Sequence, residues 1–130
     1  MSRPIPPLDL MFFATESTNS PKHVGALLLF DRPSRGGDAV RRIVRDYRAA
    51  TPVAPFNYLP QMIGRGGPQW KIAQHIDMEH HVQHVALPAG TNYASFLRFV
   101  EDLHEPMMDR NRPLFRVWII EDLPGGQFAL

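Results

Sequence analysis

Apolar residues recur at two spacings along this chain, and the spacing distinguishes predicted helices from predicted strands. After Asp38, apolar positions fall at i, i+3, i+4 and i+7, which predicts an amphipathic helix ended by Thr51-Pro52. The stripe consists of Val40, Ile43, Val44 and Tyr47. Asp38 is a suitable N-cap, because its carboxylate can accept hydrogen bonds from the free amides of the first turn.

A second helix is predicted after Pro88, capped by Thr91 or Asn92 and closed before Pro106. Its apolar stripe is Tyr93, Phe96, Leu97, Val100 and Leu103. A shorter apolar segment, residues 8–14, follows Pro6-Pro7 and predicts one or two helical turns.

Four segments before the Pro124-Gly125-Gly126 turn have strand character. His23 to Asp31 is continuously apolar, which predicts a strand buried on both faces. Residues 58–64 and 69–73 predict two short strands around a Gly-rich turn, and Leu114 to Glu121 predicts a fourth. In that last strand Phe115, Val117 and Ile119 would face one side, and Trp118 and Ile120 the other. Strands both adjacent in sequence and separated by helices favour an α+β fold, a mixed-sheet sandwich.

The stretch from His104 to Leu130 stops within a strand. It runs through a polar turn, an apolar strand, the Pro124-Gly125-Gly126 turn and then Phe128 to Leu130. Chain termini are usually exposed and frayed. We therefore interpret residues 1–130 as one partial domain truncated within a β-hairpin, and expect self-association through its cut edge or a swapped strand.

Composition narrows the possible functions. The 130 residues are 44% hydrophobic and 21% charged, as in a globular domain. A net charge of +1 without a concentrated basic face argues against a nucleic-acid partner. The absence of cysteine excludes disulfides and thiolate chemistry. The N-terminal prolines with Asp9 argue against a signal peptide, and the longest apolar run, Val24 to Phe30, is too short to span a bilayer.

Four of the six histidines lie within ten positions, but their spacing does not favour a metal site. They are His75, His80, His81 and His84. A metalloprotease helix would have Glu directly after the first His of an i, i+4 pair, where His81 stands. No serine lies in a Gly-x-Ser-x-Gly elbow, and no phosphate-binding loop is present. We interpret Asp109, Arg110 and Arg112 as a salt-bridged turn that fixes the entry angle of the last strand.

Four stretches, taken in chain order, carry a family resemblance. They are Pro7-Leu8-Asp9 with Met11-Phe12, then Lys22 to Ala26, then Pro68 to Trp70 with Ile76 to Pro88, and finally His104 to Phe115. Together they resemble the N-terminal part of the wax ester synthase/diacylglycerol acyltransferase family, within the superfamily of CoA-dependent acyltransferases. Phe115 stands where the family usually has Trp, and Met107-Met108 replaces the usual Pro-Leu.

The resemblance implies the N-terminal half of a chloramphenicol-acetyltransferase-like mixed-sheet α/β sandwich. It also implies that the enzyme transfers an acyl group from acyl-CoA to diacylglycerol or a long-chain alcohol, without a bound cofactor or metal. The expected location is the cytoplasm, in peripheral contact with membranes or lipid inclusions. The family's catalytic signature, His-His-x-x-x-Asp-Gly, normally lies a few residues beyond residue 130 and is missing from residues 1–130. The pair His80-His81 is not this signature, because the fifth position after it is Ala86 and no Asp-Gly follows. No catalytic residue is therefore expected in this chain, and the fragment itself is expected to be inactive.

The resemblance assigns expected roles to two segments. Leu8 to Phe12 is expected to form a wall of the substrate tunnel, and the strand from Pro113 to Phe115 is expected beside the catalytic strand. The candidate substrate or motif residues are Leu8, Asp9, Met11, Phe12, Pro113, Leu114 and Phe115. Two alternatives stay open: a non-catalytic lipid- or protein-binding module built on the same half-fold, and a condensation-type acyltransferase.

Overall fold

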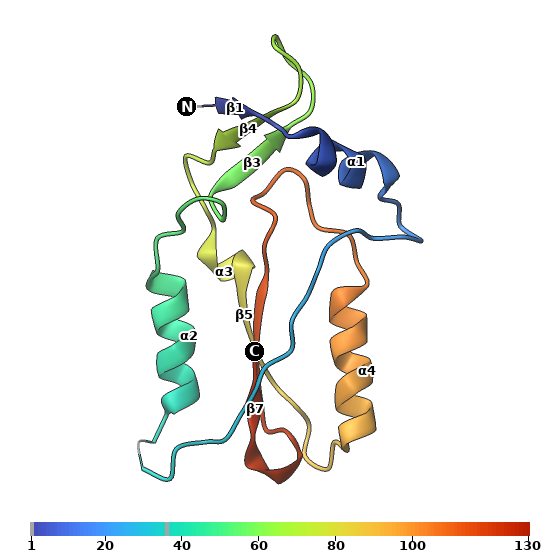
Figure 1. Ribbon diagram of the computed structural model, residues 1–130. Coiled ribbons are helices and arrows are strands. Elements are labelled where there is room, and N and C mark those ends of the chain that lie inside the picture. The colour runs from blue at the N-terminus through green and yellow to red at the C-terminus, as the bar shows by residue number, and fades with distance from the viewer. Residues whose placement is uncertain (1, 36) are drawn as a thin grey trace. The chain divides into compact units, whose positions relative to one another are not determined.

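The computed structural model describes residues 2–35 and 37–130 and consists of two compact units (Figure 1). Unit 1 takes in residues 1–24, 51–76 and 106–115, and unit 2 takes in residues 25–50, 77–105 and 116–130. Each unit has its own sheet and at least one helix, which confirms the α+β fold class. No helix of the described ranges is long and apolar enough to cross a bilayer.

Unit 1 contains a three-stranded antiparallel sheet in the order β1-β4-β3, and the helix α1. Its elements are β1 (Ser2–Pro4), α1 (Pro7–Thr15), β3 (Tyr58–Gln61) and β4 (Gln69–Ile72). Arg3 lies opposite Trp70, which in turn lies opposite Pro60. The sequence pattern therefore located β3 and β4, although both strands are shorter than predicted.

Unit 2 contains a four-stranded sheet in the order β2-β7-β6-β5. Its elements are β2 (Leu29–Phe30), α2 (Ala39–Ala49), α3 (Met78–His81), β5 (Val82–Ala86), α4 (Tyr93–His104), β6 (Val117–Glu121), the 3-10 turn η1 (Pro124–Gly126) and β7 (Phe128–Ala129). Strands β5 and β6 are parallel and are connected through α4, whereas β7 runs antiparallel to both of its neighbours. The mixed pairing confirms a mixed sheet.

The alternating side chains of β6 divide the core of unit 2 into two layers. Val117 and Ile119 belong to a cluster that includes Val40 and Val44 of α2. Trp118 and Ile120 belong to a second cluster, centred on Phe96 of α4, which is fully buried. Figure 1 shows α2 and α4 flanking the strands from opposite sides. The predicted two-faced character of this strand from Val117 onward is confirmed.

The two long helices begin in different ways. The side chain of Asn92 accepts a hydrogen bond from the Ser95 amide at 2.8 Å, so Asn92 caps α4. Asp38 stands at the N-cap of α2 but makes no capping hydrogen bond with its side chain. Its carboxylate lies 3.9 Å from the Arg41 guanidinium instead, so the predicted side-chain cap at Asp38 is wrong.

The apolar segment from His23 to Asp31 does not form the doubly buried strand that its composition predicts. Only Leu29–Phe30 forms a strand, β2, and it lies at the edge of its sheet. Both residues of β2 are exposed, and Val24 is 92% exposed. The apolar run therefore does not indicate burial on both faces, and β2 has a hydrogen-bonding neighbour on one side only, because it lies at the edge of its sheet.

The strand that ends at Leu130 has neighbours on both sides. β7 lies between β2 and β6, and the backbones of Leu28 and Leu130 exchange two hydrogen bonds, of 2.8 and 2.9 Å. The expectation of an open edge at this strand is therefore wrong. The edges of this sheet are β2 and β5.

Candidate functional site

The helix α1 presents an apolar surface that its own unit leaves uncovered. Pro7 at the first helical position supplies a helical φ, and Asp9 in the first turn complements the helix dipole. Leu8, Met11 and Phe12 follow at i, i+3 and i+4 and are 65%, 62% and 51% exposed. We call these three residues the outer stripe.

The inner side of α1 packs against β3 and β4 through a row of three aromatic rings, one of them on α1 itself, with an arginine guanidinium at each end of the row. The Phe13 and Trp70 ring centroids are 5.7 Å apart, and the Trp70 and Tyr58 centroids are 6.0 Å apart. Arg3 lies 5.2 Å from the Tyr58 centroid, and Arg110 lies 4.9 Å from that of Phe13. Stacking and cation–π contacts of this kind each contribute about 0.5–1.5 kcal/mol, so the row attaches α1 to β3 and β4.

Arg110 also reaches the C-terminal end of α1. Its guanidinium donates to the Phe13 carbonyl at 2.9 Å and to Oε1 of Glu16 at 3.0 Å. The carbonyls of the last helical turn lack partners within the helix and carry its negative dipole end, where a cation is favoured. Arg110 is therefore bound to the C-terminus of α1 through charge, hydrogen bonding and ring contact.

Of the three residues expected to form a salt-bridged turn, Asp109 and Arg112 contact each other, whereas Arg110 contacts a distant part of the chain. Asp109 lies 3.6 Å from the Arg112 guanidinium and accepts a hydrogen bond from the Asn111 amide at 2.9 Å. Arg110 takes no part in these local contacts and reaches Glu16, 94 positions earlier. Short-range spacing could not reveal this connection.

Glu16 uses both carboxylate oxygens. Oε1 accepts from Arg110, and Oε2 accepts from the Lys22 amide at 3.0 Å. Burial acts to raise the pKa of Glu16, but the hydrogen bonds from the Lys22 amide and Arg110, with the positive charge of Arg110 and the influence of His23, hold it below its ordinary value. Glu16 therefore connects three chain segments: the end of α1, residue 22 and the turn at 109–112.

The lowered pKa of Glu16 makes the stability of the protein dependent on pH. Because the folded-state pKa lies below the unfolded value of 4.5, the ionised carboxylate stabilises the fold above that pH, and this stability is lost as the pH falls through the folded pKa. We expect Glu16→Gln to lower the free energy of unfolding by about 1–2 kcal/mol at pH 7. The difference from the wild type should shrink below pH 4.5.

Urea unfolding from pH 7 down to pH 3 measures this difference. Glu105→Gln is the matched control, because it removes the same charge from an exposed position in unit 2. A constant gap between the Glu16→Gln variant and the wild type across the whole pH range would contradict the linkage.

The residues from Pro113 to Phe115 do not form a strand. Pro113 is buried, Leu114 and Phe115 are half-buried, and β6 begins only at Val117. The Phe115 amide donates to the Pro113 carbonyl at 2.9 Å, which bends the chain, and the Phe115 ring meets Phe56 edge-on at 5.7 Å. The expected strand over these residues is therefore wrong, and they belong to unit 1.

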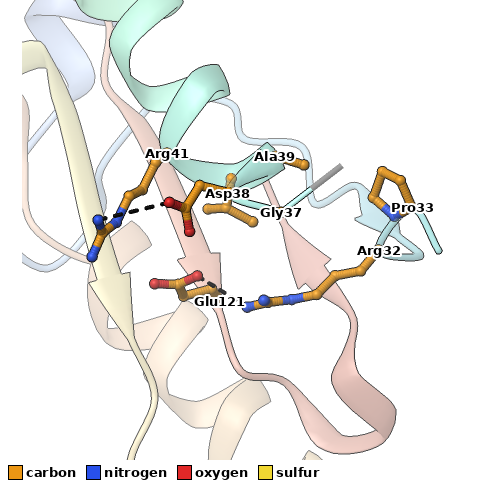
Figure 2. A pocket seen from close by; sticks show the side chains of 8 residues that line it. Arg32, Pro33, Gly37, Asp38, Ala39, Arg41 and Glu121 are labelled. Atoms are coloured by element: carbon orange, nitrogen blue, oxygen red, sulfur yellow. Dashed lines mark hydrogen bonds and ion pairs between the residues drawn. The ribbon is translucent and has the colours of Figure 1, made fainter. Parts of the chain in front are cut away.

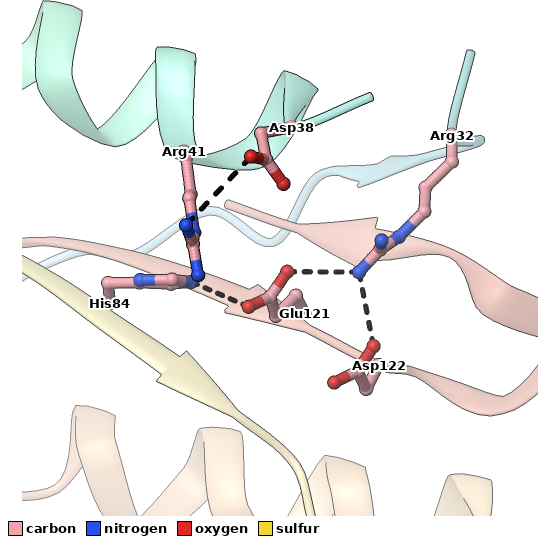
Figure 3. Close-up of polar contacts among 6 residues, drawn as sticks. All are labelled: Arg32, Asp38, Arg41, His84, Glu121 and Asp122. Atoms are coloured by element: carbon pink, nitrogen blue, oxygen red, sulfur yellow. Dashed lines mark hydrogen bonds and ion pairs between the residues drawn. The ribbon is translucent and has the colours of Figure 1, made fainter. Parts of the chain in front are cut away.

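A second cluster of polar side chains, which no motif or spacing in the sequence indicates, lies in unit 2 (Figure 3). Arg32 donates to Oε2 of Glu121 at 2.9 Å and to Asp122 at 3.1 Å. Oε1 of Glu121 lies 3.0 Å from Nε2 of His84. Residue 122 has a φ of 62°, a left-handed conformation that Asp tolerates better than most residues. The cluster connects β5, the end of β6 and the loop after β2.

A cavity of about 150 Å³ lies beside this cluster, at the start of α2 (Figure 2). It is lined by Arg32, Pro33, Gly37, Asp38, Ala39, Val40, Arg41 and Glu121. Figure 2 shows the side chains of Arg41 and Asp38 directed toward each other, as are those of Arg32 and Glu121. Because both cations of the lining are paired with carboxylates, the cavity is not preorganised for an anion.

The histidines do not converge on one point. His84 contacts Glu121, whereas His81 is buried in α3 with its ring 5.1 Å from that of His80. Over residues 2–35 and 37–130, no group of three or more His, Asp or Glu side chains is arranged to hold a metal ion.

Comparison with known proteins assigns the family. The model of the wax ester synthase/diacylglycerol acyltransferase catalytic domain matches residues 5–130. The chain belongs to this family. O-acyltransferase WSD of Acinetobacter baylyi is 34% identical over 98% of this chain and 28% of its own length. A Mycobacterium tuberculosis relative, named probable diacylglycerol O-acyltransferase tgs2, is 35% identical over 95% of this chain and 28% of its own length.

A solved structure extends the similarity to three dimensions. The wax ester synthase/diacylglycerol acyltransferase from Marinobacter aquaeolei VT8 matches 98% of this chain with a TM-score of 0.88 and 37% sequence identity. The match covers 32% of that protein. The chain therefore spans about a quarter to a third of the length of these relatives.

Proposed function

We propose that this chain contributes an apolar wall to the acyl-chain site of an O-acyltransferase, which transfers a fatty acyl group from acyl-CoA to diacylglycerol or a long-chain alcohol. The outer stripe of α1 carries the proposal. Leu8, Met11 and Phe12 offer apolar surface that unit 1 does not cover, on a helix attached by the aromatic row and Arg110. Such a surface suits a long apolar substrate, since burial of each methylene is favourable by about 0.8 kcal/mol.

In the proposed reaction the residues of the outer stripe bind the substrate and take no part in proton transfer. A general base takes the proton of the acceptor hydroxyl, whose oxygen attacks the thioester carbonyl, and the CoA thiolate leaves. We assign no residue of this chain as that base. The outer stripe would hold the acyl chain and exclude water from the thioester, which favours transfer over hydrolysis.

The proposed substrates also suggest where the protein works. Acyl-CoA, diacylglycerol and long-chain alcohols gather at membranes and lipid inclusions. We therefore place the protein in the cytoplasm, in peripheral contact with such a surface, and propose no nucleic-acid partner.

Acyl transfer from labelled palmitoyl-CoA to diacylglycerol or hexadecanol tests the proposal, with residues 1–130 and the full natural chain containing them assayed in parallel. We expect product from the full chain and none from residues 1–130 alone. Turnover by residues 1–130 alone would contradict the assignment of the base outside them. Displacement of a fluorescent fatty acid without turnover by the full chain would favour the non-catalytic lipid-binding module instead.

A further inference from the structure

We infer that Arg110 and Glu16 are positioning residues which fix the orientation of α1 and thereby set the acyl-chain length that the site accepts. The inference rests on the proposed function and assigns to this ion pair a role in specificity. Neither residue is expected to touch the reacting atoms.

The helix α1 is held at its two ends. At its N-terminal end, the buried Ile5 donates its amide to the Pro68 carbonyl at 3.1 Å, beside the start of β4. At its C-terminal end, Arg110 binds the Phe13 carbonyl and the Glu16 carboxylate. Between these ends the helix has no fully buried residue and no side-chain N-cap, so its angle depends on these attachments and on the Phe13–Trp70 contact.

The ion pair is well suited to hold one geometry. The Glu16 side chain is 12% exposed and that of Arg110 is 34% exposed. Solvent therefore screens the attraction between them less than it screens a fully exposed salt bridge. Both carboxylate oxygens are used, because Oε2 accepts from the Lys22 amide while Oε1 accepts from Arg110. Rotation of α1 would therefore break several contacts together.

The outer stripe moves with α1, because Leu8, Met11 and Phe12 all lie on that helix. A change in its angle alters how many methylenes of a bound acyl chain are covered. Each covered methylene changes the affinity for the acyl chain by about fourfold. A small rotation of α1 would therefore change the preference between long and short acyl chains more than it would change the rate of the chemical step.

The experiment measures kcat and KM for a series of saturated acyl-CoAs of increasing length, using the full natural chain with Arg110→Gln, Glu16→Gln or both. Arg65→Gln is the matched control, since it removes the same charge from an exposed loop of unit 1. We expect KM for the longest substrates to rise about tenfold or more in both single variants, with kcat for the shortest substrates changed less than about twofold. The effects of the two substitutions should be less than additive in the double variant, because Arg110 and Glu16 contact each other.

Arg110→Lys keeps the charge but lacks the planar guanidinium that lies against the Phe13 ring, so it should lie between the wild type and Arg110→Gln. Near-UV circular dichroism, to which both Trp70 and Trp118 contribute, verifies that the variants are folded. An unchanged length profile in folded Arg110→Gln, or an equal change in Arg65→Gln, would overturn the inference while leaving the proposed function standing. Absence of acyl transfer by the wild type would refute the proposed function itself.

Discussion

Phe96→Ala should cost the protein about 3–5 kcal/mol of unfolding free energy. Phe96 is fully buried at the centre of the cluster between α4 and the sheet of unit 2, where Leu87 and Ile120 are also buried. Replacing the ring by a methyl group removes its transfer free energy and leaves a cavity that the surrounding strands can fill only in part. Urea unfolding followed by far-UV circular dichroism measures the loss.

Leu97→Ala is the control for this prediction. Leu97 is the next residue of α4 and is 37% exposed, so its truncation opens no closed cavity. Because Ala is the best helix former, we expect a loss below about 1 kcal/mol. Losses of equal size in the two variants would mean that the packing of α4 has been assigned to the wrong face.

Ala129→Asp should destabilise unit 2 by about 3–5 kcal/mol, because it places a charge without a partner in the interior of the sheet. Ala129 is fully buried in β7 and lies opposite both Leu29 of β2 and Ile120 of β6. Detachment of β7 would also release the backbone of β2. Faster amide hydrogen exchange at Leu28 and Leu130, together with urea unfolding, would report both effects.

Ala26→Asp makes the same chemical change in the exposed segment that precedes β2 and should cost less than about 0.5 kcal/mol. A tolerated Asp at position 129 would contradict the interior location of β7. A substantial loss from Ala26→Asp would instead mean that the apolar segment before β2 is covered by another surface.

Periodicity predicted the elements that carry side chains into a core. In α2 and α4 the helical spacing placed Val40, Val44 and Phe96 on buried faces. In β6 the alternation divided Ile119 and Ile120 between two clusters. These predictions succeeded because burial of a regular element imposes its own period on the sequence.

The periodicity of apolar residues did not predict where each strand lies within its sheet. The apolar run ending at Phe30 contributes only a short edge strand, whereas Val82–Ala86, in a stretch rich in histidine, forms β5, paired in parallel with β6. Strand order depends on contacts between distant residues, and composition along one segment does not encode it. His81 and Val82 are buried although their segment is rich in histidine.

The candidate site was predictable only in part. The apolar character of Leu8 to Phe12 and the local ion pair of Asp109 with Arg112 can be read from neighbouring residues. The contacts of Arg110 with Glu16 and of Arg32 with Glu121 join residues 94 and 89 positions apart. A single sequence contains no spacing that selects these partners from the other charged residues.

The separation between Glu16 and Arg110 has a consequence for synthesis on the ribosome. At about 5–20 residues per second, the 94 positions between them take about 5–20 s to translate. During that interval α1 lacks the cation at its C-terminal end, and Leu8, Met11 and Phe12 emerge into solvent before the turn at 109–112 exists. Unit 1, assembled from three separate chain segments, can complete its fold only after its last segment has left the exit tunnel, so its early apolar helix is an expected client of chaperones.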